Sequence, residues 1–154
     1  MNKKILIMGI FVLILSMSVS FASLETSSAS YTIHSFKTLK YLPDCDVYIN
    51  GHTTVYSKNY YVMKVKGRYY EHHSPTYVGT SYYFISFQKV SANKLKITRK
   101  YIADRFGYFD FVPKSYTTKT SYLKYRYSAA TYYKYNYKKY RNSIINFLAP
   151  VPRY

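Results

Sequence analysis

Between residues 46 and 127, apolar and polar positions alternate in short runs. Such alternation is typical of β-strands with one buried face, because successive side chains of a strand point to opposite sides. In the run 94–98, Leu95 and Ile97 alternate with two lysines and a threonine. We predict strands at 46–49, 52–56, 60–65, 68–72, 82–90, 94–98 and 122–127.

Two glycine dipeptides separate the first four of these runs. Asn50-Gly51 lies between β-prone segments, and both central residues of a type I′ hairpin turn need a positive φ. Lys66-Gly67 separates the next two runs in the same way. We therefore expect tight turns at 50–51 and 66–67.

The C-terminal segment fits two patterns. Tyrosines alternate with polar residues over 133–138, which favours a strand, but a longer apolar stripe follows helical spacing. The stripe comprises Tyr133, Tyr137, Tyr140, Ile144 and Leu148. Pro150 would end such a helix. We predict a helix at about 130–148, with a strand as the alternative.

Together these elements predict a mainly β fold, a small antiparallel barrel or sandwich with one C-terminal α-helix. The 23 tyrosines limit how the core is built. Each buried hydroxyl needs a partner or costs about 1–3 kcal/mol. Many of the tyrosines must therefore lie at the surface or line a wet cavity.

The first 22 residues predict a signal peptide. Lys3 and Lys4 precede an apolar run, and the small Ser20 and Ala22 fit the positions before a signal peptidase cleavage site. An uncleaved membrane anchor is the alternative. Residues 23–43 begin rich in Ser and Thr and predict a flexible lead-in. Residues 44–154 then form a single β-rich domain.

Charge and predicted export narrow the class of function. The 154-residue chain carries 23 Lys and Arg against 6 Asp and Glu, a formal net charge of +17. Loss of two lysines with the signal peptide leaves +15. Export predicts an extracellular or cell-wall location of the Gram-positive type, and it makes intracellular nucleic acid an unsuitable partner.

One segment carries a resemblance. Residues 74–83 read Ser-Pro-Thr-Tyr-Val-Gly-Thr-Ser-Tyr-Tyr, and the basic alternating run 94–98 follows. This resembles the Gly-x-Trp-Tyr opening of lipocalin-like secreted surface proteins of lactic-acid bacteria, with Ser81 in the place of the tryptophan. The resemblance spans about 25 residues, 74–98, and implies a barrel; it assigns no functional residue.

The C-terminal third contains no Asp or Glu from Val112 onward and is the main functional signal. Clustered cations attract polyanions, while tyrosine rings stack on sugars or bases. We assign polyanion binding to Lys114, Lys119, Lys124, Arg126, Lys134, Lys138, Lys139 and Arg141. We assign stacking to Tyr122, Tyr125, Tyr133 and Tyr137. The expected partners are anionic cell-wall polymers or anionic lipid headgroups, and the alternative is a merely solvated face.

The lone cysteine lies between two carboxylates, Asp44-Cys45-Asp46. Negative neighbours oppose a thiolate, so we expect an inert thiol rather than a nucleophile. A disulfide-linked dimer through Cys45 is the alternative, because export favours oxidation.

We assign no metal, cofactor or catalytic residue. On a strand, His72 and His73 would point to opposite faces, and neither they nor His34 and His52 match a zinc spacing. The acids Glu71, Asp104 and Asp110 are candidates for a glycosidase pair. In so basic a chain a carboxyl group stays ionised, which does not suit a general acid.

We therefore expect a secreted, non-enzymatic cell-surface protein that binds anionic polymers, such as teichoic acid, through a basic, tyrosine-rich surface. Two alternatives remain open. One is a membrane-active antimicrobial or toxin-like protein whose basic helix inserts at anionic headgroups. The other is a lipocalin-like binder that holds a small apolar ligand in a tyrosine-lined cavity.

Overall fold

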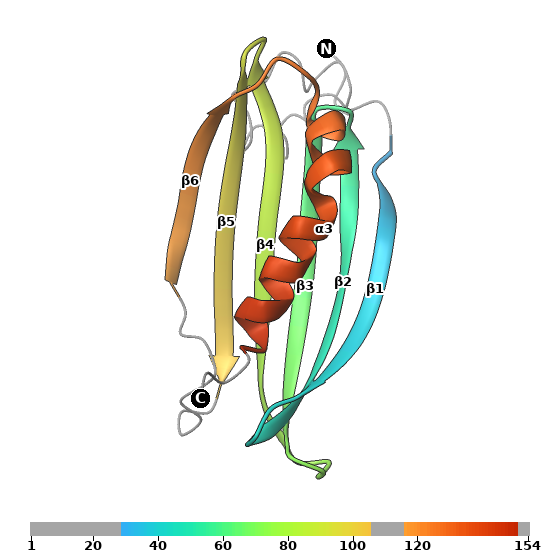
Figure 1. The fold of residues 1–154 in the computed structure, drawn as a ribbon, viewed down its shortest axis with the longest axis vertical. Helices are drawn as coiled ribbons and strands as arrows, with labels where there is room; N and C mark the ends of the chain where they lie inside the picture. Colours follow the sequence, from blue (N-terminus) through green and yellow to red (C-terminus); the bar gives the residue numbers. More distant parts are fainter. Residues whose placement is uncertain (1–28, 106–115, 151–154) are drawn as a thin grey trace, which may run out of the picture.

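The computed structural model describes residues 29–105 and 116–150, without the side chains of 103–105 and 116–117. The predicted signal peptide, residues 1–22, lies outside these residues. Six strands precede one long helix (Figure 1). The strands are β1 (Tyr31–Tyr41), β2 (Cys45–Ser57), β3 (Tyr60–Glu71), β4 (Tyr77–Ser91), β5 (Lys94–Arg105) and β6 (Tyr116–Lys124), and the helix is α3 (Ala129–Leu148).

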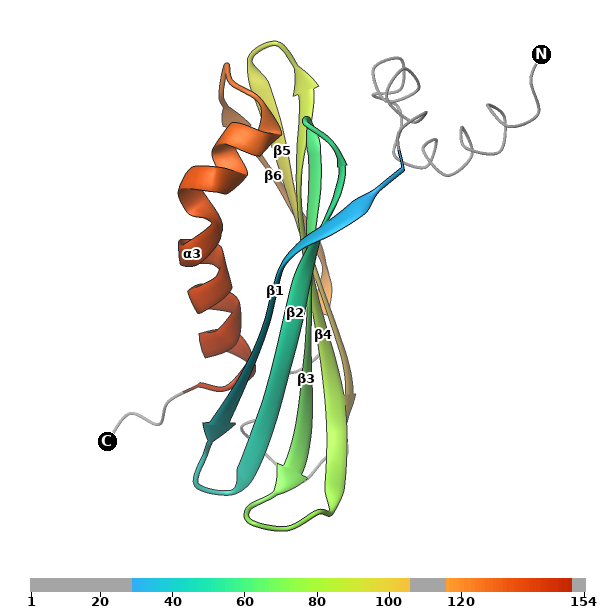
Figure 2. The same cartoon turned by 90° about the vertical axis from the view of Figure 1, so that its right-hand side faces the viewer.

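The strands form a single antiparallel sheet in which each strand pairs with the next along the chain, in the order β1-β2-β3-β4-β5-β6. The helix α3 crosses one face of this twisted sheet, and no described element covers the other face (Figure 2). The prediction of a mainly β, antiparallel fold with one C-terminal helix is confirmed. The helix, and not a second sheet, is the layer that covers the sheet. Among the described residues β1 and β6 do not pair, so the sheet does not close into a barrel there.

The two predicted glycine turns are wrong. Asn50-Gly51 lies in the middle of β2, and Lys66-Gly67 lies in the middle of β3. Neither glycine has a positive φ, and Asn50 pairs directly with Lys66 across the two strands. The four short strands predicted over 46–72 are therefore two long strands. The real turn between them is at Lys58-Asn59.

The flexible lead-in predicted for 23–43 is wrong from residue 31 onward. Residues Tyr31–Tyr41 form the edge strand β1, which pairs antiparallel with β2. Only one side of this strand has a neighbour, and most of its side chains are exposed. Such an exposed edge strand can have a polar composition. Residues 31–41 form a strand through their pairing with β2 and not through a strong apolar pattern of their own.

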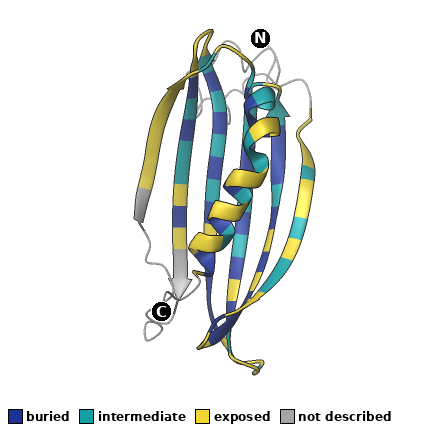
Figure 3. Cartoon of the chain, in the orientation of Figure 1, coloured by how far each residue is buried: buried dark blue, intermediate teal, exposed yellow. Residues whose placement is uncertain are grey.

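The core lies between the sheet and α3. Along β2 to β5, buried residues alternate with more exposed ones, and the buried side of α3 faces the sheet (Figure 3). Ser128 begins the helix, because its Oγ accepts a hydrogen bond from the Thr131 backbone N–H at 3.1 Å. Buried positions on the helix follow the predicted stripe, and the predicted helix is confirmed to within one residue. They are Ala129, Tyr132, Tyr133, Tyr140, Ile144 and Leu148.

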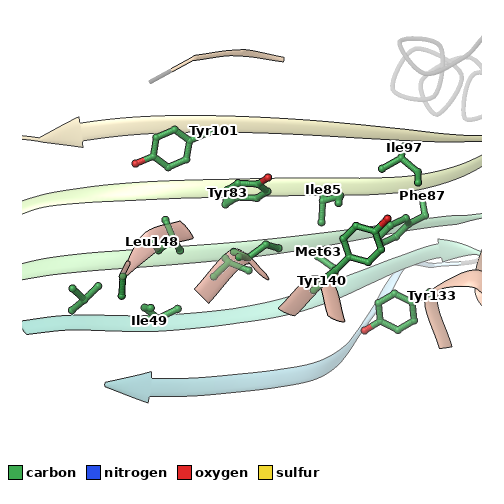
Figure 4. Packing of buried hydrophobic residues seen from close by; sticks show 14 of the residues in the cluster. Ile49, Met63, Tyr83, Ile85, Phe87, Ile97, Tyr101, Tyr133, Tyr140 and Leu148 are labelled. Carbon is green, nitrogen blue, oxygen red and sulfur yellow. The ribbon is translucent and has the colours of Figure 1, made fainter. Parts of the chain in front are cut away.

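Aromatic rings fill much of this core. Phe87 on β4 packs against Tyr140 of the helix with ring centroids 5.0 Å apart, near the aliphatic Ile85 and Met63 (Figure 4). Buried hydroxyls have partners: Tyr132 and Tyr140 hydrogen-bond each other at 2.8 Å. No buried side-chain N or O atom of the described residues lacks a partner. The tyrosine-rich core is thus made without unpaired buried hydroxyls in this part of the chain.

Candidate anion-binding face

The face of the sheet opposite α3, which we call the open face, carries the outward side chains of the strands. On β3 the residues Met63, Val65 and Tyr69 are buried under the helix. Their neighbours Lys64 and Lys66 therefore point to the other side, because side chains alternate along a strand. Arg68 follows at the same two-residue spacing. These three cations lie about 7 Å apart along the strand.

The register between the strands places other outward residues beside these cations, in rows that cross the sheet. His52, Lys64, Phe84 and Lys100 are successive partners from β2 to β5. The next rows are Asn50, Lys66, Tyr82 and Ile102, then Tyr48, Arg68 and Thr80. Since neighbouring strands lie about 4.8 Å apart, the cations and aromatic rings of the open face form one continuous surface.

Cations and tyrosines on the open face contact each other directly. The Lys66 ammonium lies 5.7 Å from the centre of the Tyr82 ring, and the Arg68 guanidinium lies 5.9 Å from that of Tyr70. At the far edge, Lys94 lies 5.5 Å from the ring of Tyr122, which is 61% exposed. Such pairs hold the rings beside positive charge while leaving them accessible to a ligand.

An open groove of about 660 Å³ occupies the β1–β3 side of this face. Its walls are basic, aromatic and polar. The outward residues that line it are Lys37, Leu39, Tyr48, Asn50, Arg68 and Tyr70. Cations from two different strands, Lys37 on β1 and Arg68 on β3, therefore line the same groove together with the rings of Tyr48 and Tyr70.

Acidic side chains are scarce on the open face. Among the outward side chains that the structure describes on β2 to β5, Asp46 at the end of β2 is the single acid, and its side chain is only 9% exposed. The side chain of Asp104 and all of Asp110 lie outside the described residues. Glu71, the third member of the predicted glycosidase group, ends β3. No described geometry therefore brings these three carboxylates together.

The predicted polyanion residues do not form one surface. Lys119 and Lys124 lie on β6, Arg126 lies in the connection to the helix, and four more lie on α3. Those on the helix are Lys134, Lys138, Lys139 and Arg141. Lys114 lies outside the described residues. Since α3 covers one face of the sheet, its lysines and the open face are on opposite sides of the molecule (Figure 2).

The predicted stacking tyrosines differ in exposure. Tyr122 is exposed on the open face, whereas Tyr125 and Tyr137 are half-buried against other rings. Tyr133 is 3% exposed, and its hydroxyl hydrogen-bonds Thr53 at 2.7 Å and His34 at 2.6 Å. The Tyr133 ring therefore belongs to the core and leaves little surface for stacking on a ligand. Burial raises its pKa.

A second groove, of about 520 Å³, brings part of the predicted set together between α3 and β1. Tyr133, Lys134, Tyr137 and Lys138 line it with His34. Lys134 and Lys138 are its two cations, whereas the groove on the open face, with Lys37 and Arg68, continues into the surface that carries Lys64, Lys66 and Lys100. The second groove is therefore the weaker of the two candidate sites for a polyanion.

Cys45 is fully buried at the start of β2. Burial, with a further contribution from Asp46 and Asp44, raises the pKa of its thiol to about 12. The thiol is thus protonated at neutral pH, in keeping with the predicted inert role. The buried sulfur gives the alternative of a disulfide-linked dimer no accessible partner surface.

His72 and His73 do not lie on a strand. β3 ends at Glu71, so His72 and His73 lie in the following turn, with ring centroids 3.8 Å apart. The premise that they point to opposite faces is therefore wrong. Both lie beside Asp46, which accepts a hydrogen bond from His72 Nδ1 at 2.8 Å.

The fold gives less support to the two alternative functions, a membrane-active protein and a binder of a small apolar ligand. The apolar stripe of α3 is used in the core, where Ile144 and Leu148 are buried, so insertion into a bilayer would require the helix to detach. No helix among the described residues is long and apolar enough to span a membrane. Side chains of the core cluster lie between the sheet and the helix (Figure 4), and the two grooves described above are open to solvent.

Comparison with known protein families, with curated proteins and with solved structures finds no match for this chain. The resemblance at 74–98 therefore stays a prediction. Sequence reasoning missed the open face, although the signal was present as Lys64-x-Lys66-x-Arg68 and Lys94-x-Lys96-x-Thr98-x-Lys100. The alternate cations of β3 and β5 lie on one face once the register of both strands with β4 is known.

Proposed function

We propose that this protein is a secreted, non-enzymatic binder of anionic cell-surface polymers of the teichoic acid type, and that the open face of its sheet is the binding surface. One observation carries the proposal. On the side of the sheet without a helix, Lys and Arg line the strands β3 and β5, and the neighbouring strands β2 and β4 place tyrosine rings beside them. The partner is inferred from charge and from the predicted export.

The physical basis is electrostatic. A polymer of repeated phosphates that lies on the open face displaces its condensed counterions as it meets Lys64, Lys66 and Arg68. Release of these ions favours binding at low salt and weakens it as salt rises. Exposed rings such as Tyr48 and Tyr82 add contacts with the sugar or polyol units between phosphates. A rigid sheet holds these groups in place at little entropic cost.

The test is binding of the exported chain to purified Gram-positive walls, with and without teichoic acid, over a salt series. We expect binding that needs teichoic acid and falls by about tenfold or more between 50 and 200 mM salt. Binding that is indifferent to both conditions would overturn the proposed function.

Two triple variants with the same loss of charge locate the surface. The first replaces Lys64, Lys66 and Arg68 with Gln on the open face. The control replaces Lys134, Lys138 and Lys139 with Gln on the exposed side of α3. We expect the first to weaken binding by about tenfold or more and to lower the salt slope by about 2–3, and the control to change little. Equal losses in both would show dependence on net charge alone and would overturn the assignment to the open face.

A further inference from the structure

One corner of the fold collects negative and imidazole groups in an otherwise basic chain. It lies where β1 ends, β2 begins and β3 ends. Three of the chain's six acidic residues and two of its four histidines are here. They are Asp44, Asp46, Glu71, His72 and His73. Register explains the gathering, because Cys45 pairs with Glu71 and so brings the sequence neighbours of both together.

The Asp46 carboxylate holds both histidines. One of its oxygens accepts a hydrogen bond from His72 Nδ1 at 2.8 Å, and the other accepts one from the His73 backbone N–H at 3.1 Å. A metal ion can take the place of the proton between these atoms, so that His72 Nδ1 and an Asp46 oxygen, already 2.8 Å apart, both become ligands. The carboxylate is itself 9% exposed, whereas the His72 side chain is 37% exposed and accessible from solvent.

The backbone places the two imidazoles on one side. His73 has a φ of 55°, in the left-handed region that residues other than glycine rarely adopt. The turn is closed by a hydrogen bond from the Ser74 N–H to the Glu71 carbonyl oxygen at 3.0 Å. The Tyr41 ring lies 6.3 Å from that of His72 and 6.0 Å from that of His73, between centroids. The turn therefore brings the two imidazoles side by side, with ring centroids 3.8 Å apart.

We propose that Asp46, His72 and His73 bind one divalent transition-metal ion of the zinc class. Each residue offers a ligand atom, and these atoms lie within 4.8 Å of one another. Ligand bonds of about 2.0–2.2 Å place the ligand atoms of a tetrahedral zinc ion about 3.3–3.5 Å apart. Binding therefore requires the exposed imidazoles to turn so that their nitrogens close the remaining distance. The fourth position faces solvent and takes a water molecule.

The donor set selects the class of ion. Two imidazole nitrogens and one carboxylate oxygen suit Zn²⁺, Co²⁺, Ni²⁺ and Cu²⁺, whereas Ca²⁺ and Mg²⁺ prefer oxygen ligands alone. The neighbouring carboxylates of Asp44 and Glu71 add negative charge to the corner. They favour a cation here despite the net charge of +17 on the whole chain.

Titration of the full chain with ZnCl₂ in a calorimeter tests the proposal, with CoCl₂ absorption as a spectroscopic check of nitrogen ligation. We expect one equivalent of Zn²⁺ to bind and Ca²⁺ or Mg²⁺ in excess not to displace it. Three variants, His72→Gln, His73→Asn and Asp46→Asn, should each weaken Zn²⁺ binding by at least tenfold. Asn is chosen at 73 because it tolerates a positive φ.

His52→Gln is the matched control, since His52 is a half-buried histidine on the open face and outside the corner. It should bind Zn²⁺ as the wild type does. Absence of a stoichiometric site in the wild type would overturn the proposal, as would His72 and His73 variants that bind normally. Circular dichroism checks that each variant folds. Metal binding does not depend on the proposed polymer binding, so the two proposals fail separately.

Discussion

The Tyr69 hydroxyl donates a hydrogen bond to the Leu148 backbone carbonyl oxygen at 2.7 Å, and so joins the middle of the sheet to the last turn of the helix. Both residues are fully buried. The last carbonyl groups of a helix have no partner within the helix, and a buried one must find a partner elsewhere. Tyr69 is the partner that lets α3 end inside the core, against β3.

Replacing Tyr69 with Phe keeps the ring and removes this bond. We expect a loss of about 1–3 kcal/mol in the free energy of unfolding, because the Leu148 carbonyl is left buried without a donor. Urea unfolding measures the loss. The control is Tyr48→Phe on the open face, where Tyr48 is 48% exposed, and it should change stability by less than about 0.5 kcal/mol. Equal stability of the two variants would contradict the capping role of Tyr69.

Gly51 and Gly67 form a second matched pair on adjacent strands, because Gly51 of β2 pairs with Val65 and Gly67 of β3 pairs with Ile49. A Cβ at Gly51 would lie 2.7 Å from Phe36 Cε1 and 3.0 Å from Val65 Cγ2. At Gly67 the nearest atom, Tyr69 Cε2, would be 3.4 Å away. We expect Gly51→Ala to destabilise the protein by about 1–3 kcal/mol and Gly67→Ala to cost clearly less. The difference in urea midpoint between the two variants is the measurement, and a reversed order would contradict the contact with Phe36.

Lys89 is a buried cation that holds the connection between β6 and α3. It is 8% exposed, and its ammonium donates hydrogen bonds to the carbonyl oxygens of Tyr125 and Tyr127, the latter at 2.7 Å. Burial lowers its pKa. Lys89→Met keeps the apolar stem and removes both bonds, so we expect a loss of about 1–3 kcal/mol. Lys96→Met, on the open face, is the control in thermal unfolding and should melt close to the wild type.

The helix could be predicted from the sequence, whereas the strand boundaries could not. Helical spacing of Tyr133, Tyr140, Ile144 and Leu148 is a local pattern, and the sheet buries that same stripe. Asn50-Gly51 is also a local pattern, but pairing on both sides of β2 overrides its turn preference. The contact that decides it, with Phe36, joins residues of two different strands.

The candidate sites depend on register for the same reason. Lys64 and Lys100 lie far apart in the sequence and become neighbours of Phe84 only through the pairing of β3, β4 and β5. The charge of the C-terminal third was visible in the sequence, but α3 turns part of it to the other side of the molecule. His72 and His73 lie side by side because β3 ends at Glu71, one residue before the predicted end of the strand.

Alkaline pH should destabilise the fold through its buried tyrosines. Burial raises the pKa of Tyr60 to about 12, and it also raises the pKa values of Tyr69, Tyr132 and Tyr133. In the unfolded chain these groups lose their protons near pH 10. Above that pH the native state holds more protons than the unfolded state, so the free energy of unfolding falls as pH rises. Each such group contributes about 1.4 kcal/mol per pH unit up to its folded pKa.

Urea unfolding at about pH 8, 9.5 and 11 measures this dependence. Stability should begin to fall above about pH 8.5, because burial also raises the pKa of the Cys45 thiol to about 12, and the fall should steepen above pH 10 as the buried tyrosines titrate only on unfolding. Deprotonation of lysines in the same range reduces the net positive charge and acts in the opposite direction. The comparison with Tyr60→Phe separates the two, because this variant keeps every lysine and should lose one tyrosine's share of the slope between pH 10 and 12. A slope identical to that of the wild type would show that Tyr60 ionises equally in both states, against its burial beside Tyr56.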